Sequence, residues 1–202
     1  MIAKRCLDVL VASAGLLLLG PLLVGVAVAI KLDSPGPVFF RQVRVGRHGR
    51  EFRIHKFRTM VAQQDDRRQR QITVGEDPRI TRVGAWLRRT KVDELAQFID
   101  VLQGTMSLVG PRPEVPRYVA LYPAALRERV LSVKPGITDL ASLAYRDEST
   151  LLARAADPER EYVEVVMPAK LAMAARYAEH PTVAGDLVIL WRTLGILLGL
   201  HK

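Results

Sequence analysis

Residues 9–30 read VLVASAGLLLLGPLLVGVAVAI and contain no charged side chain. A straight helix over these residues would be about 33 Å long, close to the thickness of a bilayer hydrocarbon core. Gly20 and Pro21 lie at the midpoint, where the missing backbone donor of proline and its clash with the preceding turn predict a kink. The segment is consistent with a cleaved signal peptide, with a kinked spanning helix, or with a re-entrant hairpin that returns to the side it entered.

Basic residues flank both ends of this apolar segment. The flanking set is Lys4 and Arg5 before it, then Lys31, Arg41, Arg44 and Arg47 after it. Because positive flanks stay in the cytoplasm, a re-entrant hairpin explains both clusters, and either helical topology places residues 31–202 on the cytoplasmic side. The length of the apolar run and the basic sequence after it disfavour a signal peptide. We therefore divide the chain into a membrane segment, residues 1–33, and a cytoplasmic-face domain, residues 34–202; composition leaves both helical topologies open.

The composition excludes a disordered or fibrous chain, since 49% of the 202 residues are hydrophobic and 25% are charged. The formal net charge is +9. Residues 31–134 carry 21 basic and 11 acidic side chains, a net charge of +10, which predicts an anionic partner: nucleic acid, an anionic membrane or a phosphorylated substrate. A single cysteine, Cys6, excludes an intramolecular disulfide, and four histidines outside any Cys/His pattern disfavour structural zinc.

The domain is predicted to be mainly α-helical with one small β-hairpin, an α+β fold. Residues 38–45 and 51–57 have β-branched and aromatic content and flank a glycine-containing turn, which predicts the hairpin. Helices are predicted at residues 82–89, 90–103, 116–132, 158–166 and 169–179. Residues 63–71 suggest a polar loop and residues 134–138 a turn. The apolar residues 186–199 fit either a buried core helix or an interfacial helix anchored by Trp191.

The chief candidates for chemistry are Asp93 and Glu94. With Thr90 as N-cap, both fall in the first turn of the predicted helix 90–103, where a capping box alone would explain them. A functional role is favoured by their position in the most basic part of the chain. Spacing also places Asp93 on the polar side of that helix with Gln97 and Asp100. A carboxylate at a helix N-terminus suits a nucleophile or a Mg²⁺ ligand.

Two further elements suit anion binding. Residues 56–60, KFRTM, place Lys56 and Arg58 at the end of the hairpin, and Arg112 lies between Pro111 and Pro113 on a stiff backbone. A stiff backbone lowers the entropy lost when an arginine binds a phosphate. A solvated arginine on a turn would explain either motif more simply. The sequence has no Walker loop and no GxGxxG motif.

Three ordered stretches carry a family resemblance: SPGPVFFRQVRVGRHGREFRIHKFRTM at residues 34–60, DPRITRVGAWLRRTKVDELAQFIDVLQGTMSLVGPRP at 77–113, and KPGIT at 134–138. Together with the N-terminal apolar segment they resemble the bacterial sugar transferases, which are monotopic polyprenyl-phosphate phosphoglycosyl transferases. The length is similar to that of the small members that consist of the catalytic core alone.

The resemblance implies a re-entrant N-terminal helix that breaks at Pro21, and interfacial amphipathic helices at the cytoplasmic face of the bacterial inner membrane. It implies transfer of a sugar-1-phosphate from a nucleotide sugar, usually a UDP-sugar, to undecaprenyl phosphate with release of UMP, the first membrane step of glycoconjugate or exopolysaccharide synthesis. Asp93 would form a covalent phosphosugar intermediate and contact Mg²⁺, and Glu94 would tune or deprotonate. The implied phosphate-binding residues are Lys56, Arg58, Arg88 and Arg112, with Arg146 near the nucleotide.

Two departures from the family pattern limit what the resemblance implies. Gly20 stands where many members have serine, and residues 139–150 read DLASLAYRDEST where many have GLAQVNGR. The sugar is therefore not identified, and the assignment of Arg146 is weakened. The expected partners are a UDP-sugar, undecaprenyl phosphate and membrane lipid, with no nucleic acid, and a homodimer is compatible. The alternative is a non-enzymatic, membrane-tethered basic module that binds anionic lipid or nucleic acid.

Overall fold

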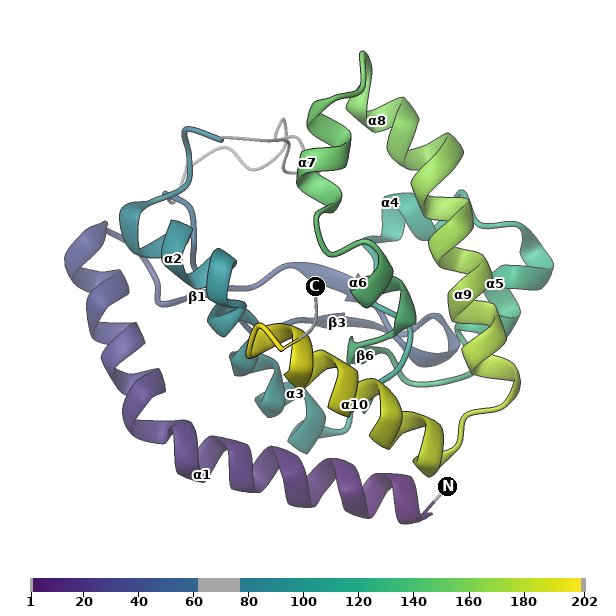
Figure 1. Cartoon of the computed structure of the whole chain (residues 1–202), viewed down its shortest axis with the longest axis horizontal. Coiled ribbons are helices and arrows are strands. Elements are labelled where there is room, and N and C mark those ends of the chain that lie inside the picture. Colours follow the sequence, from purple (N-terminus) through teal and green to yellow (C-terminus); the bar gives the residue numbers. More distant parts are fainter. Residues whose placement is uncertain (1, 62–76, 201–202) are drawn as a thin grey trace.

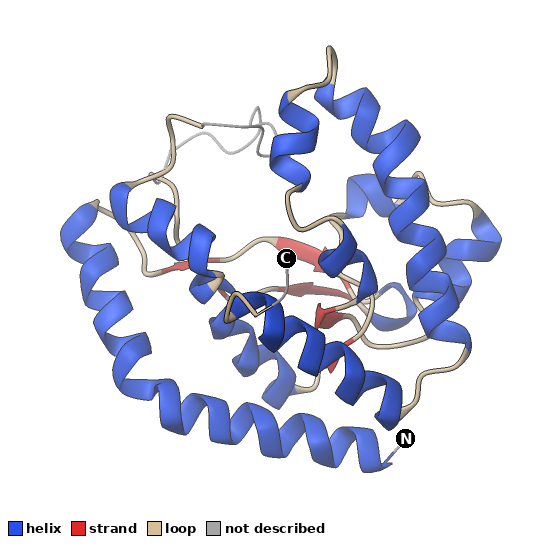
Figure 2. Ribbon diagram, in the orientation of Figure 1, coloured by secondary structure: helices blue, strands red, loops and turns tan. Residues whose placement is uncertain are grey.

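The computed structural model describes residues 2–61 and 77–200, so the polar loop predicted at 63–71 lies outside the described residues. The fold is mainly helical with three small two-stranded sheets among these residues (Figure 2). The α-helices are α1 (Ile2–Asp33), α2 (Arg82–Thr90), α3 (Phe98–Gln103), α4 (Pro116–Val119), α5 (Ala124–Val130), α6 (Leu140–Ala144), α7 (Glu148–Ala153), α8 (Pro158–Glu161), α9 (Met167–Glu179) and α10 (Val183–Leu197). The strands are β1 (Phe39–Phe40), β2 (Val43–Val45), β3 (Glu51–Arg53), β4 (Lys56–Phe57), β5 (Ser107–Val109) and β6 (Gly136–Thr138).

Helix α1 contains Pro21 and changes direction near its middle, where it bends around one side of the domain (Figure 1). A proline inside a helix removes one hydrogen bond and pushes the preceding turn away, which accounts for the bend. Of the described helices, α1 alone is long and apolar enough to cross a membrane, and only 11% of its most apolar window is buried. Such exposed apolar surface is compatible with membrane association and unlike a core helix.

Both ends of α1 are fastened to the same domain. Near the N-terminal end, Lys4 Nζ lies 2.5 Å from Asp186 Oδ2 and donates to the Val109 carbonyl at 2.9 Å. At the C-terminal end, Asp33 Oδ2 accepts a hydrogen bond from the Val83 backbone N–H at 3.0 Å. The domain therefore contacts α1 on both sides of its bend.

The predicted hairpin is confirmed. Strand β2 pairs antiparallel with β3, and β1 pairs with β4, in one continuous register that matches Phe39 with Phe57 and Val45 with Glu51. The turn contains a short 3₁₀ segment, Arg47–Gly49, in which His48 has a φ of 58°. Between the two pairs of strands the ladder has a gap at residues 41–42 and 54–55, where the Ile54 N–H still donates to the Gln42 carbonyl at 3.1 Å.

The prediction of a single helix over residues 90–103 is wrong, because the structure has a 3₁₀ helix followed by a short α-helix there. Thr90 is the last residue of α2, and its hydroxyl donates to the Trp86 carbonyl at 2.9 Å instead of capping a new helix. Lys91 adopts a left-handed conformation with a φ of 58°, which ends α2 and starts a separate 3₁₀ helix, η3 (Val92–Gln97). Helix α3 follows directly and ends at Gln103, the predicted end of the helix, where Gly104 adopts a left-handed conformation with a φ of 81°.

The 3₁₀ turns also change which side chains are buried. A 3₁₀ helix has 3.0 residues per turn instead of 3.6, so the faces expected for a continuous α-helix shift. Asp93, Gln97 and Asp100, predicted on the polar side, are each at most 2% exposed, whereas the apolar Leu102 is exposed. The polar side of this segment faces inward, toward the hairpin.

Residues 136–138, predicted as part of a turn, instead form strand β6, which pairs in parallel with β5. The start of β6 lies very close to the residue that follows β5, since a Cβ added to Gly136 would lie 2.1 Å from the Gly110 nitrogen. Only glycine fits there. The helix predicted over 116–132 is divided into α4 and α5, and Pro123, which has no backbone donor, stands at the start of α5.

Helix α10 combines both interpretations of the C-terminal apolar segment. Its inner face, with Asp186, Ile189 and Gly195, is buried. The helix also exposes apolar side chains: Leu187, Val188, Trp191 and Leu194. Trp191 is 71% exposed. The helix thus combines a buried inner side with exposed apolar side chains suited to a lipid interface.

Candidate active site

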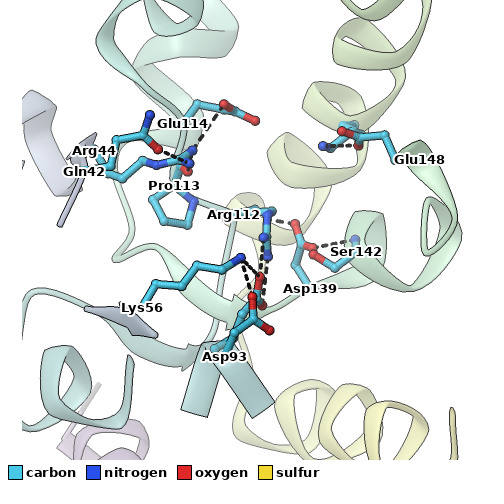
Figure 3. Close-up of polar contacts among 12 residues, drawn as sticks. Gln42, Arg44, Lys56, Asp93, Arg112, Pro113, Glu114, Asp139, Ser142 and Glu148 are labelled. Atoms are coloured by element: carbon cyan, nitrogen blue, oxygen red, sulfur yellow. Dashed lines mark hydrogen bonds and ion pairs between the residues drawn. The ribbon is translucent and has the colours of Figure 1, made fainter. Parts of the chain in front are cut away.

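Two carboxylates and two cations converge below the Pro111–Pro113 turn (Figure 3). Asp93 and Glu94 come from η3, Lys56 from strand β4, and Arg112 from the turn after β5. The sequence separates these residues by up to 56 positions. They meet because the hairpin packs against η3 and the parallel β5–β6 pairing holds the turn above it. The structure therefore brings together four of the residues that the sequence proposed.

Asp93 is almost completely buried, at 1% exposure. Its Oδ2 atom lies 2.9 Å from Lys56 Nζ. Its Oδ1 atom is buried and has no hydrogen-bond partner among the described residues. An unpaired carboxylate oxygen at a buried position is costly unless something else binds it. Asp93 thus keeps one oxygen available for a ligand or for bond formation.

Glu94 is held by both cations. Arg112 binds it with two nitrogens, Nη2 to Oε1 at 2.6 Å and Nη1 to Oε2 at 3.3 Å, and Lys56 Nζ lies 3.3 Å from Oε1. Burial by itself would raise the pKa of Glu94, but the charges of Arg112 and Lys56 and the Arg112 hydrogen bonds hold this pKa well below its usual range. Glu94 in turn raises the pKa of Arg112. The pair is a bidentate ion pair, fully charged at neutral pH.

The turn that carries Arg112 is fixed from two sides. The Arg112 backbone N–H donates to Asp139 Oδ2 at 3.3 Å, while Asp139 Oδ1 caps α6 by accepting from the Ser142 N–H at 2.7 Å. On the hairpin side, Arg44 donates to the Pro113 carbonyl at 3.0 Å and pairs with Glu114 at 3.6 Å (Figure 3). The turn backbone is therefore held by the start of α6 on one side and by strand β2 of the hairpin on the other.

Sequence reasoning missed the supporting residues Asp139 and Arg44. Asp139 carried a usable signal, since an aspartate directly before a helix is a typical N-cap. Arg44 was noted only as part of the basic flank, because its partners lie about 70 residues away in sequence. No local pattern identifies such a contact.

Arg58 does not face the two carboxylates. Its buried guanidinium donates to the carbonyls at the end of α1 and of the following turn: Pro35 at 2.5 Å, Ser34 at 2.6 Å and Ile30 at 3.2 Å. Helix ends leave carbonyls without intrahelical partners, and arginine can satisfy several at once. Arg58 therefore anchors α1 against the hairpin, and its role toward phosphate stays a prediction.

Arg88 and Arg146 lie outside the cluster. Arg88 belongs to the last turn of α2, and Arg146 is exposed in the turn between α6 and α7. Within residues 2–61 and 77–200 neither side chain forms a hydrogen bond or an ion pair with the protein. Their roles toward phosphate and nucleotide stay predictions. The remaining predicted positions, Gly20 and Pro21, lie in the bent region of α1, where a Cβ on Gly20 would meet no atom within 4 Å.

No group of three or more potential metal ligands from His, Cys, Asp and Glu occurs in the described part of the chain. A protein cage for a cation is therefore absent from these residues. Mg²⁺ commonly binds through one or two carboxylates together with substrate phosphates. The open Oδ1 of Asp93 fits that mode.

Comparisons with known proteins agree with the geometry. A family model described as bacterial sugar transferase matches residues 1–199. The chain is 45% identical over 154 residues to the UDP-glucose:undecaprenyl-phosphate glucose-1-phosphate transferase of Escherichia coli strain K12, covering 75% of this chain and 33% of that protein. It is 40% identical over 197 residues to a protein of the same name from Caulobacter vibrioides, covering 96% of this chain and 69% of that protein.

A relative from Aeromonas hydrophila is named for a different sugar. This UDP-N-acetylgalactosamine-undecaprenyl-phosphate N-acetylgalactosaminephosphotransferase is 43% identical over 146 residues, covering 70% of this chain and 34% of that protein. The chain thus spans about a third of the length of the Escherichia coli and Aeromonas relatives.

Proposed function

The chain belongs to the bacterial sugar transferase family, and we propose that it transfers a sugar-1-phosphate from a UDP-sugar to undecaprenyl phosphate and releases UMP. The names of the relatives support both substrates. Those relatives are named for glucose and for N-acetylgalactosamine, so the donor is proposed only as a UDP-sugar. The product would be the first membrane-bound intermediate of polysaccharide synthesis.

The observation that carries this proposal is the state of Asp93: buried, paired with Lys56 through one oxygen, and unpaired at the other. In the first step, an Asp93 carboxylate oxygen bonds to the β-phosphorus of the donor. The bond from that phosphorus to the oxygen bridging the two phosphates breaks, and UMP leaves with the electron pair. An oxygen of undecaprenyl phosphate then bonds to the same phosphorus, and the bond to Asp93 breaks, which restores the carboxylate.

Lys56 and Arg112 supply the positive charge that this reaction needs. Phosphoryl transfer between anions depends mainly on positioning and charge neutralisation, and both cations already lie within 3.3 Å of the carboxylates. Glu94 has a pKa well below its usual range, which makes it a weak base at neutral pH. We therefore assign Glu94 to orienting Arg112 and Lys56 instead of to deprotonation.

Asp93, with the donor diphosphate, would hold a Mg²⁺ ion. The unpaired Oδ1 atom supports this role. Bound there, the ion would neutralise charge on the phosphates. Chelation with EDTA is expected to abolish UMP release and added Mg²⁺ to restore it; full activity after chelation would exclude the ion.

The membrane topology is proposed to be re-entrant. Lys4 and Asp33, near opposite ends of α1, both bond to the one domain, which a straight spanning helix would not permit. The exposed apolar faces of α1 and α10 would enter one leaflet of the bacterial inner membrane from the cytoplasmic side. In a Cys6→Ser background, an Ala3→Cys variant should resist an impermeant maleimide added from the periplasmic side, whereas rapid labelling would show that the helix spans.

UMP release tests the function directly. The full chain in detergent is incubated with undecaprenyl phosphate, Mg²⁺ and a panel of UDP-sugars, and Asp93→Asn is run in parallel. We expect UMP from at least one donor, loss of that signal in Asp93→Asn, and a phosphosugar adduct on Asp93 by mass spectrometry. The matched control Asp157→Asn removes a carboxylate that caps α8, distant in sequence from the cluster, and should stay active. Equal UMP release by Asp93→Asn would refute the mechanism, and a folded protein that is silent with every donor would favour the lipid- or nucleic-acid-binding module.

A further inference from the structure

We propose that Arg41, His55 and Asp100 form a hydrogen-bonded chain that positions Lys56 against Asp93. The proposal rests on the proposed function, because Lys56 matters for the reaction only if Asp93 reacts. Asp100 and His55 are both buried, at 1% and 7% exposure, and neither touches the two carboxylates of the site. They are positioning residues, which act on the reaction through Lys56.

The chain has four close contacts. The Asp100 carboxylate receives two of them from His55: Oδ2 accepts from the backbone N–H, and Oδ1 lies opposite ring atom Nδ1, both at 2.8 Å. On the other side of the ring, Arg41 Nη1 lies 2.6 Å from Nε2, and Arg41 Nη2 donates to the Arg53 carbonyl at 2.9 Å. Phe39 contacts the ring edge-on at 5.9 Å between centroids.

These contacts allow one direction of hydrogen bonding. A guanidinium can only donate, so Nε2 must accept from Arg41 and cannot carry a proton. Nδ1 therefore carries the proton and donates to Asp100, which leaves the imidazole neutral in its Nδ1–H tautomer. The chain runs from Arg41 through His55 to Asp100 with every donor matched to an acceptor.

The hydrogen-bonded chain lies at a gap in the ladder, where the hairpin register places Arg41 opposite His55. The neighbouring Ile54 N–H donates to the Gln42 carbonyl across the hairpin at 3.1 Å, so the next N–H, that of His55, points away from the partner strand and donates to Asp100. Asp100 thus satisfies a backbone donor that the hairpin leaves free. Lys56 is the next residue, and its Nζ reaches Asp93 at 2.9 Å.

The same contacts tie the strand to the helix segment that carries the reactive carboxylate. Asp93, Gln97 and Asp100 are spaced four and three residues apart and are all buried on the side facing the hairpin. Asp100 therefore fastens this segment to β4 at one point, and the Lys56–Asp93 pair joins them at another. Losing the first contact lets strand and helix separate, and a displacement of about 1 Å at a reacting centre costs about a hundredfold in rate.

The chemical reactivity of Lys56 reports its position without requiring catalysis. The full chain in detergent is treated with an amine-acylating ester, and peptide mass spectrometry gives the labelling rate of Lys56 relative to exposed Lys31. In Asp100→Asn, the amide NH2 must face either the His55 backbone N–H or ring Nδ1–H, and the second clash is avoided only by the other tautomer, which places Nε2–H against Arg41. We expect the ratio to rise roughly tenfold, the factor set by one hydrogen bond to a charged group.

A second substitution tests the direction of hydrogen bonding from Arg41 through His55 to Asp100. Arg41→Gln removes the guanidinium facing Nε2, so the other tautomer becomes acceptable, and Asp100→Asn/Arg41→Gln should return to the Lys56 ratio of Arg41→Gln alone. The control Asp186→Asn alters an equally buried carboxylate that bonds Lys4 and Tyr177, and should leave the ratio unchanged. An unchanged ratio in Asp100→Asn, or a double variant as reactive as Asp100→Asn, would overturn the proposal.

A measurement on the unmodified protein covers the case in which Asp100→Asn does not fold. Nitrogen-15 spectra of histidine-labelled protein at neutral pH should show His55 protonated at Nδ1 only, assigned by its change in Arg41→Gln. A ring protonated at Nε2, or at both nitrogens, would refute the proposed hydrogen bonding from Arg41 through His55 to Asp100. UMP release by the unsubstituted protein decides the proposed function separately, since neither the labelling nor the spectra depend on turnover.

Discussion

Replacing Arg112 with methionine tests the electrostatic core of the site. The substitution keeps the aliphatic bulk and removes both contacts to Glu94, at 2.6 and 3.3 Å. Breaking a buried ion pair by removing one partner costs about 3–5 kcal/mol, whereas an exposed pair contributes about 0.2–1 kcal/mol. The Glu94 side chain is 13% exposed and that of Arg112 36%, and Lys56 remains 3.3 Å from Glu94. We therefore expect a loss of about 2 kcal/mol, between these limits.

Thermal unfolding in detergent at pH 7.5 measures this loss. For a chain of this size, about 2 kcal/mol lowers the melting temperature by about 4–8 °C. The double variant Glu94→Gln/Arg112→Met leaves no unpaired charge and should recover most of that loss in melting temperature. Neither variant should release UMP, because both lack the Arg112 guanidinium. The control Arg117→Met breaks an ion pair with Glu159 whose side chains are 59% and 46% exposed, and should shift the melting temperature by only about 1–2 °C.

Two results would refute this reasoning. If the double variant melts as low as Arg112→Met, the loss comes from packing around residue 112 and not from an unpaired Glu94. If Arg112→Met has the same melting temperature as Arg117→Met, the Arg112–Glu94 ion pair is screened by solvent and contributes no more than a surface ion pair.

Three further predictions concern packing, protonation and the membrane. A Cβ at Gly84 would lie 2.0 Å from the Thr59 carbonyl oxygen, so Gly84→Ala must push α2 off the hairpin and should cost about 1–3 kcal/mol in a denaturant titration. Glu94 has a folded-state pKa below its unfolded value, so its contribution to stability is present above about pH 4.3 and is lost as pH falls through the folded pKa. The melting temperature of the unsubstituted protein should therefore fall more steeply below about pH 4 than that of Glu94→Gln, and parallel curves would contradict this. Trp191→Ser removes the most exposed aromatic ring of α10 and should weaken flotation with anionic vesicles, whereas exposed Leu121, which is not on α10, should tolerate serine in the same assay.

Local sequence patterns were reliable where one residue's own chemistry decides the structure. Pro21 predicts a bend and α1 bends, the β-branched and aromatic stretches 38–45 and 51–57 predict a hairpin that the structure contains, and α3 ends at residue 103, the predicted helix end. The basic setting of the adjacent carboxylates singles out Asp93 and Glu94, which the structure places beside Lys56 and Arg112. In each case the relevant energy comes from steric limits or periodicity within a few residues.

Local patterns failed where a neighbour far along the chain changes the outcome. Lys91 takes a left-handed conformation that costs a non-glycine residue free energy, and nothing in its own sequence indicates it. That single residue separates α2 from η3 and turns Asp93, Gln97 and Asp100 inward. The sequence of Arg58 beside Lys56 gives no sign that its guanidinium donates to the carbonyls of Ile30 and Ser34 at the end of α1.

The sequence by itself determined that this protein has a long, bent apolar helix, a basic antiparallel hairpin and an adjacent pair of acidic residues in a basic setting. These features depend on side-chain hydrophobicity, charge and local sterics, which are properties of short segments. Only the tertiary structure decided which cations reach those carboxylates. Lys56, Arg112 and Glu94 meet because the parallel pairing of β5 with β6 and the packing of η3 on the hairpin close loops of many residues, and the free energy of such contacts depends on the whole domain being folded.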